Sequence, residues 1–102
     1  MIEKVIQKAI VEYLTYRRVF HWRNNSGAMI SEYKGKTRMM RFGAVGSPDI
    51  FALKGGILYG IEVKTTKGTQ SDHQIEFQKN METHGGIYFV ARSIDDVQAK
   101  GL

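Results

Sequence analysis

The stretch of residues 46–67 constrains the fold of this chain most, because it has the pattern of two strands joined by a very short turn. Residues 50–53 and 57–63 are rich in apolar and β-branched side chains. The pair Gly55-Gly56 between them can adopt the positive φ angles that a tight hairpin turn requires. The sequence therefore predicts a β-hairpin whose register is set by these two glycines.

That register places two acidic residues opposite each other at the open end of the hairpin. If Lys54 pairs with Ile57, Asp49 lies directly across from Glu62, where Cβ atoms are about 4.5–5.5 Å apart and like charges are destabilising. A bound divalent cation is the simplest reason for such a pair. Lys64 is two residues beyond Glu62 and leaves the same face of the strand. We therefore expect Asp49, Glu62 and Lys64 to form one cluster.

The cluster has the composition of a site for metal-assisted phosphodiester hydrolysis. Two carboxylates in a chain without cysteine suit Mg²⁺ or Mn²⁺ better than Zn²⁺. The lysine could stabilise charge on a phosphate or position an attacking water. None of the three histidines has a partner at helical metal-ligand spacing, so a zinc hydrolase has little support.

The same residues resemble a known nuclease signature. Pro48-Asp49, followed after the hairpin by Glu62-Val63-Lys64, resembles the motif of the PD-(D/E)XK nucleases. The wider chain is similar to one branch of them, the virus-type replication-repair nuclease (VRR-NUC) domain. Further matching segments follow in the expected order and cover nearly the whole chain: Glu3 with Ile6-Gln7, Trp22 to Gly27, Gly46 to Asp49, and Gly68 to Gln74 ahead of Gly85 to Arg92.

The resemblance implies a metal-dependent DNA endonuclease with Mg²⁺ or Mn²⁺ as its cofactor. Asp49 and Glu62 would hold the metal, with the backbone carbonyl of Val63 as an additional ligand. Lys64 would stabilise or position the attacking hydroxide. Small members of this branch resemble homodimeric phage enzymes that resolve four-way (Holliday) junctions or cut other branched DNA in repair, so a homodimer and branched DNA are the expected partners.

Two further residues have competing interpretations. By spacing alone, Glu3 is a solvated acid favoured by the helix dipole, whereas the resemblance implies that it could join the metal site. Gln74 matches the helix glutamine of the family and would support catalysis, with Gln78 one turn later as the second choice. The alternative for Gln74 and for Gln78 is an exposed polar residue on a helix.

The candidate DNA contacts are basic and amide side chains, in a chain whose net charge is +5. Lys34, Lys36 and Arg38 are spaced by two, which would align them along phosphates in an extended segment. A solvated edge hairpin turning at Gly35 explains the same pattern, and both interpretations can hold together. The full predicted set is Arg23, Asn25, Lys34, Lys36, Arg38, Arg41 and Lys67.

Periodicity predicts one α/β domain over residues 1–102, with a mixed β-sheet flanked by helices and, from the resemblance, a PD-(D/E)XK nuclease-like fold. In the strand of residues 19–24, Trp22 is expected to pack inward. Ser71 and the pair Ser93 and Asp96 are expected to cap helices. The remaining predicted helices and strands are helices over 2–17, 72–84 and 94–100, and a strand over 87–91.

Composition sets the remaining expectations. The absence of cysteine and of any long apolar run predicts a soluble protein, in the cytoplasm of a bacterium or a phage-infected host cell, with no membrane partner. Two alternatives to a stand-alone enzyme remain open. One is a nucleic-acid-binding module with weak catalysis, and the other is a nuclease subunit that cuts only with a partner.

Overall fold

The computed structural model describes the backbone of residues 2–24, 27–33, 35–42 and 44–102, and the side chains of residues 2–24, 35–37 and 44–102. Three helices and six strands are assigned within these ranges. In chain order they are α1 (Glu3–Tyr16), β1 (Phe20–Arg23), β2 (Gly27–Tyr33), β3 (Lys36–Phe42), β4 (Ile50–Lys54), β5 (Ile57–Val63), α2 (Asp72–Thr83), β6 (Ile87–Ala91) and α3 (Ile94–Ala99).

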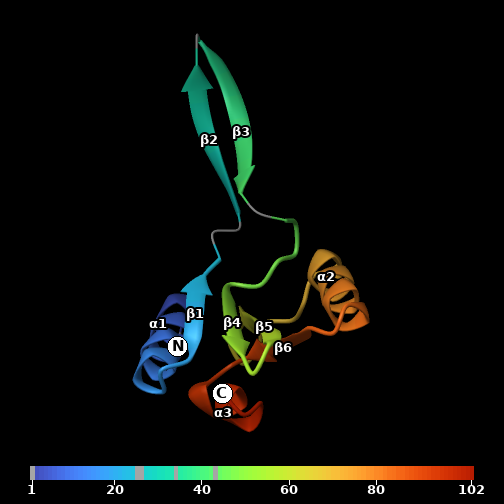
Figure 1. Ribbon diagram of the computed structural model, residues 1–102. Helices are drawn as coiled ribbons and strands as arrows, with labels where there is room; N and C mark the ends of the chain where they lie inside the picture. The colour runs from blue at the N-terminus through green and yellow to red at the C-terminus, as the bar shows by residue number, and fades with distance from the viewer. Residues whose placement is uncertain (1, 25–26, 34, 43) are drawn as a thin grey trace.

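Four of the strands form a mixed sheet in the order β1-β4-β5-β6 (Figure 1). The first three are antiparallel neighbours, and β6 runs parallel to β5. The β4–β5 hairpin has the predicted register, with Lys54 opposite Ile57 and Ile50 opposite Ile61. Gly55 and Gly56 both have positive φ, as the two-residue turn requires. The α/β class and the mixed sheet are therefore confirmed.

The core lies between one face of this sheet and the pair α1 and α3. The apolar stripe of α1 places Ile6, Ile10 and Leu14 against the sheet because these residues recur at helical spacing. The sheet contributes Ile50 and Ile61, which are paired across the hairpin and fully buried. This packing fixes β4 and β5, and through them the residues at the open end of the hairpin.

Helix α2 covers part of the opposite face. It contacts β6, where the rings of Phe77 and Tyr88 have centroids 6.1 Å apart and Gln78 Nε2 donates to the Tyr88 carbonyl. The β1 and β4 end of this face stays open, and there Trp22 is 42% exposed. The expectation that Trp22 packs inward is therefore wrong, because α2 lies over the other half of the sheet.

The β2–β3 hairpin forms a separate two-stranded sheet that projects away from the rest of the molecule (Figure 1). Its turn contains Gly35, whose φ is +73°, so the predicted hairpin turning at this glycine is confirmed. It is not an edge of the main sheet, since β2 pairs with β3 in a sheet of their own.

The predicted helix caps agree with the structure in one case and differ in the other. Ser71 caps α2 as expected. The Ser93 side chain makes no cap hydrogen bond to α3, and Asp96 Oδ2 instead accepts from the backbone amide of Arg92 at 2.8 Å. Across the described ranges, no helix combines the length and apolar character needed to cross a bilayer.

Candidate active site

The open end of the β4–β5 hairpin brings three predicted site residues together. Asp49 directly precedes β4, and its Oδ2 accepts a hydrogen bond of 2.8 Å from the backbone amide of Val63. The Lys64 ammonium lies 3.7 Å from Oε2 of Glu62. The register that pairs Ile50 with Ile61 puts Asp49 opposite Glu62, so the predicted cluster is present.

Glu62 is the most unusual titratable group of the cluster, because it is only 5% exposed. The pKa of Glu62 is raised from 4.5 to about 8, mainly by burial and then by the negative charge of Asp49, although Lys64 acts in the opposite direction. One lysine therefore does not compensate two carboxylates held in a poorly solvated position. A divalent cation between them would supply the missing positive charge, so the donor set fits the predicted Mg²⁺ or Mn²⁺.

The Val63 carbonyl is compatible with its predicted role as a third ligand. In an extended strand the N–H and C=O of one residue point to the same side, and the Val63 N–H points at Asp49. The carbonyl therefore faces the Asp49 side of β5. Among the described residues, no group of three or more His, Cys, Asp or Glu side chains is close enough to hold a metal ion.

Glu3 lies near the pair without forming such a group with it. Its side chain is exposed in the first turn of α1, and its charge makes the smallest of the contributions that raise the pKa of Glu62. The residue is thus within electrostatic range of Glu62. Its proposed part in metal binding stays a prediction.

Asn24 was absent from the predicted site, although it holds the loop that carries Asp49. Its Nδ2 donates to Ser47 Oγ at 2.8 Å and to the Pro48 carbonyl at 2.9 Å. Its backbone amide donates to the carbonyl of Asp49 at 2.8 Å. The sequence pattern did not distinguish Asn24 as a loop anchor, since its side-chain contacts join residues far apart in the chain.

The same loop approaches α2 very closely at Gly46. This residue has a φ of +83°, and a Cβ on it would lie 2.2 Å from the carbonyl oxygen of His73. Only glycine fits there, because any side chain would collide with backbone. This close approach joins the Asp49 loop to the first turn of α2.

Lys64 is positioned by the loop that follows it. A Cβ on Gly68 would lie 3.3 Å from both Cβ and Cδ of Lys64, so the lysine stem packs directly on the Gly68 backbone. Arg92 closes this loop, because its Nη1 donates to the carbonyls of Thr65 and Gly68, the latter at 2.7 Å. The sequence pattern gave no indication of this role for Arg92, since the contact joins residues far apart in the chain.

Gln74 forms a capping box with Ser71 at the start of α2. Its side-chain Oε1 accepts from the backbone amide of Ser71 at 2.9 Å, and its backbone amide donates to Ser71 Oγ at 3.2 Å. Gln78, the second choice, donates to Glu82 and to the Tyr88 carbonyl and accepts from Gln70 at 2.9 Å. Both glutamines are half-buried and hydrogen-bonded within the protein, unlike the exposed helix residues of the alternative interpretation, and their part in catalysis stays a prediction.

Tyr88 pairs with Gly60, two residues before Glu62 on β5, and was not predicted as part of the site. Burial raises the pKa of its hydroxyl, and the negative charges of Glu62 and Asp49 raise it further. The hydroxyl donates to the Gly46 carbonyl at 3.4 Å. Tyr88 thus stays neutral and contacts the Asp49 loop.

The predicted DNA-contacting residues are only partly described. Arg23, Lys36 and Lys67 are exposed, with Arg23 at the end of β1 and Lys36 beside the turn of the projecting hairpin. Asn25 and Lys34 lie outside the described residues, as do the side chains of Arg38 and Arg41. Compared with known families and with curated proteins, the chain matches no family model and no curated protein.

Proposed function

We propose that this protein is an Mg²⁺- or Mn²⁺-dependent endodeoxyribonuclease with a PD-(D/E)XK nuclease fold of the VRR-NUC type. One observation carries the proposal: a buried glutamate and an aspartate face each other beside a lysine at the end of one hairpin. Buried like charges are costly in a structural role, whereas a metal-dependent hydrolase needs them.

Asp49 and Glu62 would hold the divalent cation, with the Val63 carbonyl as an additional ligand, and the resemblance adds Glu3 as a further candidate ligand. When bound, the cation acts as a Lewis acid that offsets charge on the phosphate and makes water more acidic. Lys64 would donate to a non-bridging phosphate oxygen or hold the attacking water, since its ammonium lies beside Glu62. The side-chain amide of Gln74, on α2, would help to orient that water.

The substrate is inferred to be DNA, and branched DNA in particular. Exposed Arg23, Lys36 and Lys67, in a chain of net charge +5, supply cations for phosphate contacts. The preference for four-way junctions or flaps, and action as a homodimer, come from the resemblance. A twofold dimer would supply the two sites that a symmetric pair of cuts requires.

A cleavage assay tests the proposal. Labelled four-way junction, flap and duplex DNA are incubated with the protein in Mg²⁺, Mn²⁺ or EDTA. Cutting should require the metal and should fall by about a hundredfold or more in Asp49→Ala and Lys64→Ala. The matched controls are Glu76→Ala and Lys79→Ala, which remove exposed charges on α2 and should cut like the wild type.

Tight binding without cutting in either metal would overturn the stand-alone enzyme. It would favour instead a binding module or a subunit that needs a partner. Equal cutting by the wild type and both site variants would show that the cluster is not the active site.

A further inference from the structure

Helix α2 covers only half of one face of the sheet, and the uncovered half carries three aromatic rings in a row. Phe20 and Trp22 alternate along β1, and Trp22 pairs across the sheet with Phe51 of β4. Ring centroids are 5.6 Å apart both between Phe20 and Trp22 and between Trp22 and Phe51. We call Phe20, Trp22 and Phe51 the aromatic row.

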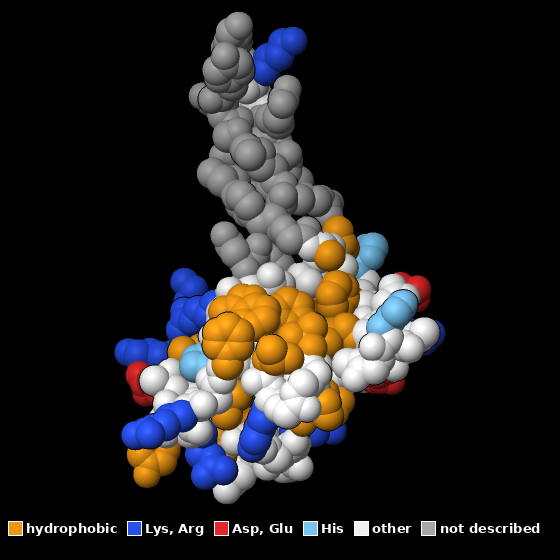
Figure 2. Space-filling model, in the orientation of Figure 1, with side chains coloured by type: hydrophobic (Ala, Val, Ile, Leu, Met, Phe, Trp, Pro, Cys, Tyr) orange, Lys and Arg blue, Asp and Glu red, His pale blue; other side chains and the backbone are white. Residues whose placement is uncertain are grey.

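The aromatic row is exposed to solvent where α2 does not reach. Phe20 is 66% exposed, Trp22 is 42% exposed, and Phe51 is half-buried. Figure 2 shows hydrophobic side chains gathered on this face, with lysine and arginine side chains along its α1 side. Large exposed apolar clusters of this kind usually mark an interaction surface.

The aromatic row borders the candidate active site. Asp49 and Phe51 are two residues apart, so they lie on the same face of the sheet at a separation of about 6.6–6.8 Å along the strand. That distance is comparable to one nucleotide step of an extended strand. A phosphate bound beside Lys64, next to the cation that Asp49 and Glu62 would hold, would therefore place a neighbouring base over the ring of Phe51.

We propose that the aromatic row stacks unpaired bases of the strand whose phosphate enters the Asp49–Glu62 site. The inference builds on the proposed function and specifies its substrate as DNA with unpaired or splayed nucleotides next to the scissile phosphate. Stacking on aromatic rings tolerates any sequence, because every base has a π face. Bases inside an intact duplex stack on one another and cannot reach the aromatic row.

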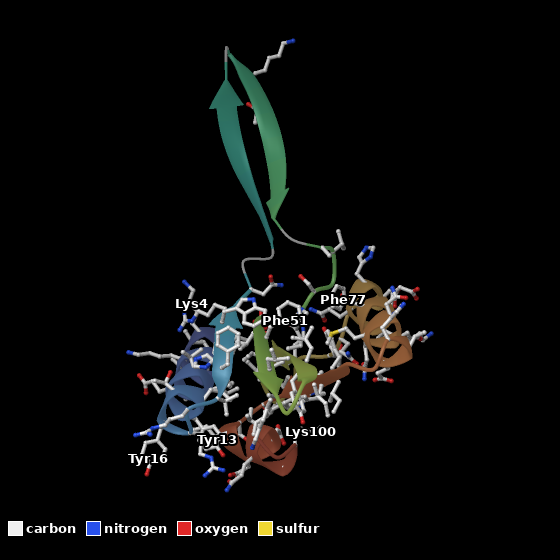
Figure 3. All side chains as sticks on the ribbon, in the orientation of Figure 1. Lys4, Tyr13, Tyr16, Phe51, Phe77 and Lys100 are labelled. Carbon is white, nitrogen blue, oxygen red and sulfur yellow. The ribbon has the colours of Figure 1, made fainter. Side chains whose placement is uncertain are left out.

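The charges and the size of the surface favour DNA over a second copy of the chain. Lysine and arginine side chains line the α1 side of this face in Figure 2, and Figure 3 shows Lys4 on that side. An aromatic side chain buries about 150–250 Å² when fully covered, so three partly exposed rings offer a few hundred Å². A stable protein interface needs about 800 Å² from each partner.

The single tryptophan of the chain provides the test, because Trp22 is in the aromatic row. Oligothymidylate and a duplex of equal length are titrated into the full chain in EDTA, and tryptophan emission is recorded. The single strand should quench Trp22 emission, and the duplex should not. Phe51→Leu and Phe20→Leu should each weaken binding of the single strand by about tenfold.

Tyr16→Leu is the matched control. Tyr16 is 84% exposed at the far end of α1, away from Phe51 (Figure 3). This variant should bind like the wild type, and retained circular dichroism spectra would show that all three variants are folded.

Three outcomes would overturn stacking. The first is unchanged Trp22 emission on saturation with the single strand. The second is equal affinity in all three variants. The third is a blue shift of Trp22 emission as the protein concentration rises, together with a dimer in sedimentation that the Phe51→Leu variant does not form. This result would assign the surface to a second copy of the chain.

The EDTA titration separates this inference from the proposed nuclease activity. A wild type that cuts DNA, but binds it equally well after Phe51→Leu, would keep the nuclease and reject stacking. Quenching by the single strand without cutting in any metal would keep the aromatic row as a binding surface and reject the nuclease.

Discussion

The backbone amide of Val63 donates a 2.8 Å hydrogen bond to Oδ2 of Asp49, which ties the start of one strand to the end of the next. The bond keeps the Asp49 carboxylate from turning away from its neighbour Glu62. The two acids therefore share one poorly solvated space whether or not a cation is present. This forced proximity makes the stability of the metal-free protein depend on pH.

Glu62→Gln should stabilise the metal-free protein at high pH. The pKa of Glu62 is about 8 in the folded chain and 4.5 unfolded, so its contribution is fully present below pH 4.5 and is lost as the pH rises through about 8. Unfolding in urea with EDTA, from pH 5 to 9, should show the wild type losing up to a few kcal/mol relative to Glu62→Gln.

Glu76→Gln, an exposed change on α2, is the control and should follow the wild type. Excess Mg²⁺ should restore the wild type above pH 8 and leave Glu62→Gln unaffected. Parallel curves for the wild type and Glu62→Gln in EDTA would contradict the assigned burial.

Gly68→Ala should impair cutting while leaving the fold intact. The added methyl would lie 3.3 Å from Cβ and Cδ of Lys64, so the lysine must shift by a few tenths of an ångström. We expect turnover to fall by about tenfold with little change in melting temperature, since small displacements of a catalytic group are costly. Thr66→Ala, in the same loop, should behave as the wild type, and an unchanged rate in Gly68→Ala would show that the position of Lys64 is not critical.

Asn24→Ala should lower both stability and turnover. It removes two side-chain donors, to Ser47 Oγ and the Pro48 carbonyl, and releases the loop before Asp49. Stability should fall by about 1–3 kcal/mol, because buried Ser47 and its neighbour lose their partner. Urea denaturation and cleavage rates measure the two effects, with Asn80→Ala on the exposed face of α2 as control. Full activity per folded molecule in Asn24→Ala would limit this residue to a stabilising role.

Gln74→Glu separates the two roles of that side chain. Glutamate can accept from the Ser71 amide as glutamine does, so the capping box and the melting temperature should be retained. The change removes the amide donor and adds a negative charge near the phosphate, so cutting should fall by at least about tenfold. Wild-type cutting in this variant would leave Gln74 with the cap alone.

Local pattern was enough to predict the elements and the central cluster. The Gly55-Gly56 turn set the hairpin register, and period-two spacing placed Lys64 beside Glu62. Each of these contacts depends on residues close together in the chain. The hairpin register and the position of Lys64 therefore agree with the sequence, because a turn and a periodicity determine them.

Contacts between distant segments could not be predicted in the same way. Asn24 reaches the Pro48 loop across the sheet, and Arg92 reaches the carbonyls after Lys64. Trp22 lies outside the core because α2 covers only the other end of its face. Alternation along a strand indicates which side chains share a face, but the packing of a separate helix decides which face is open.

The β4–β5 hairpin carries Asp49, Glu62 and Lys64 within one short, contiguous part of the chain. Hairpins of this kind close in about 1–10 μs, so the three groups meet at an early step of folding. Helices α1 and α3 dock on the opposite side of the sheet and complete the core. Substitutions in their buried faces should thus lower the amount of folded protein in a cell and leave the geometry of this cluster unchanged in each folded molecule.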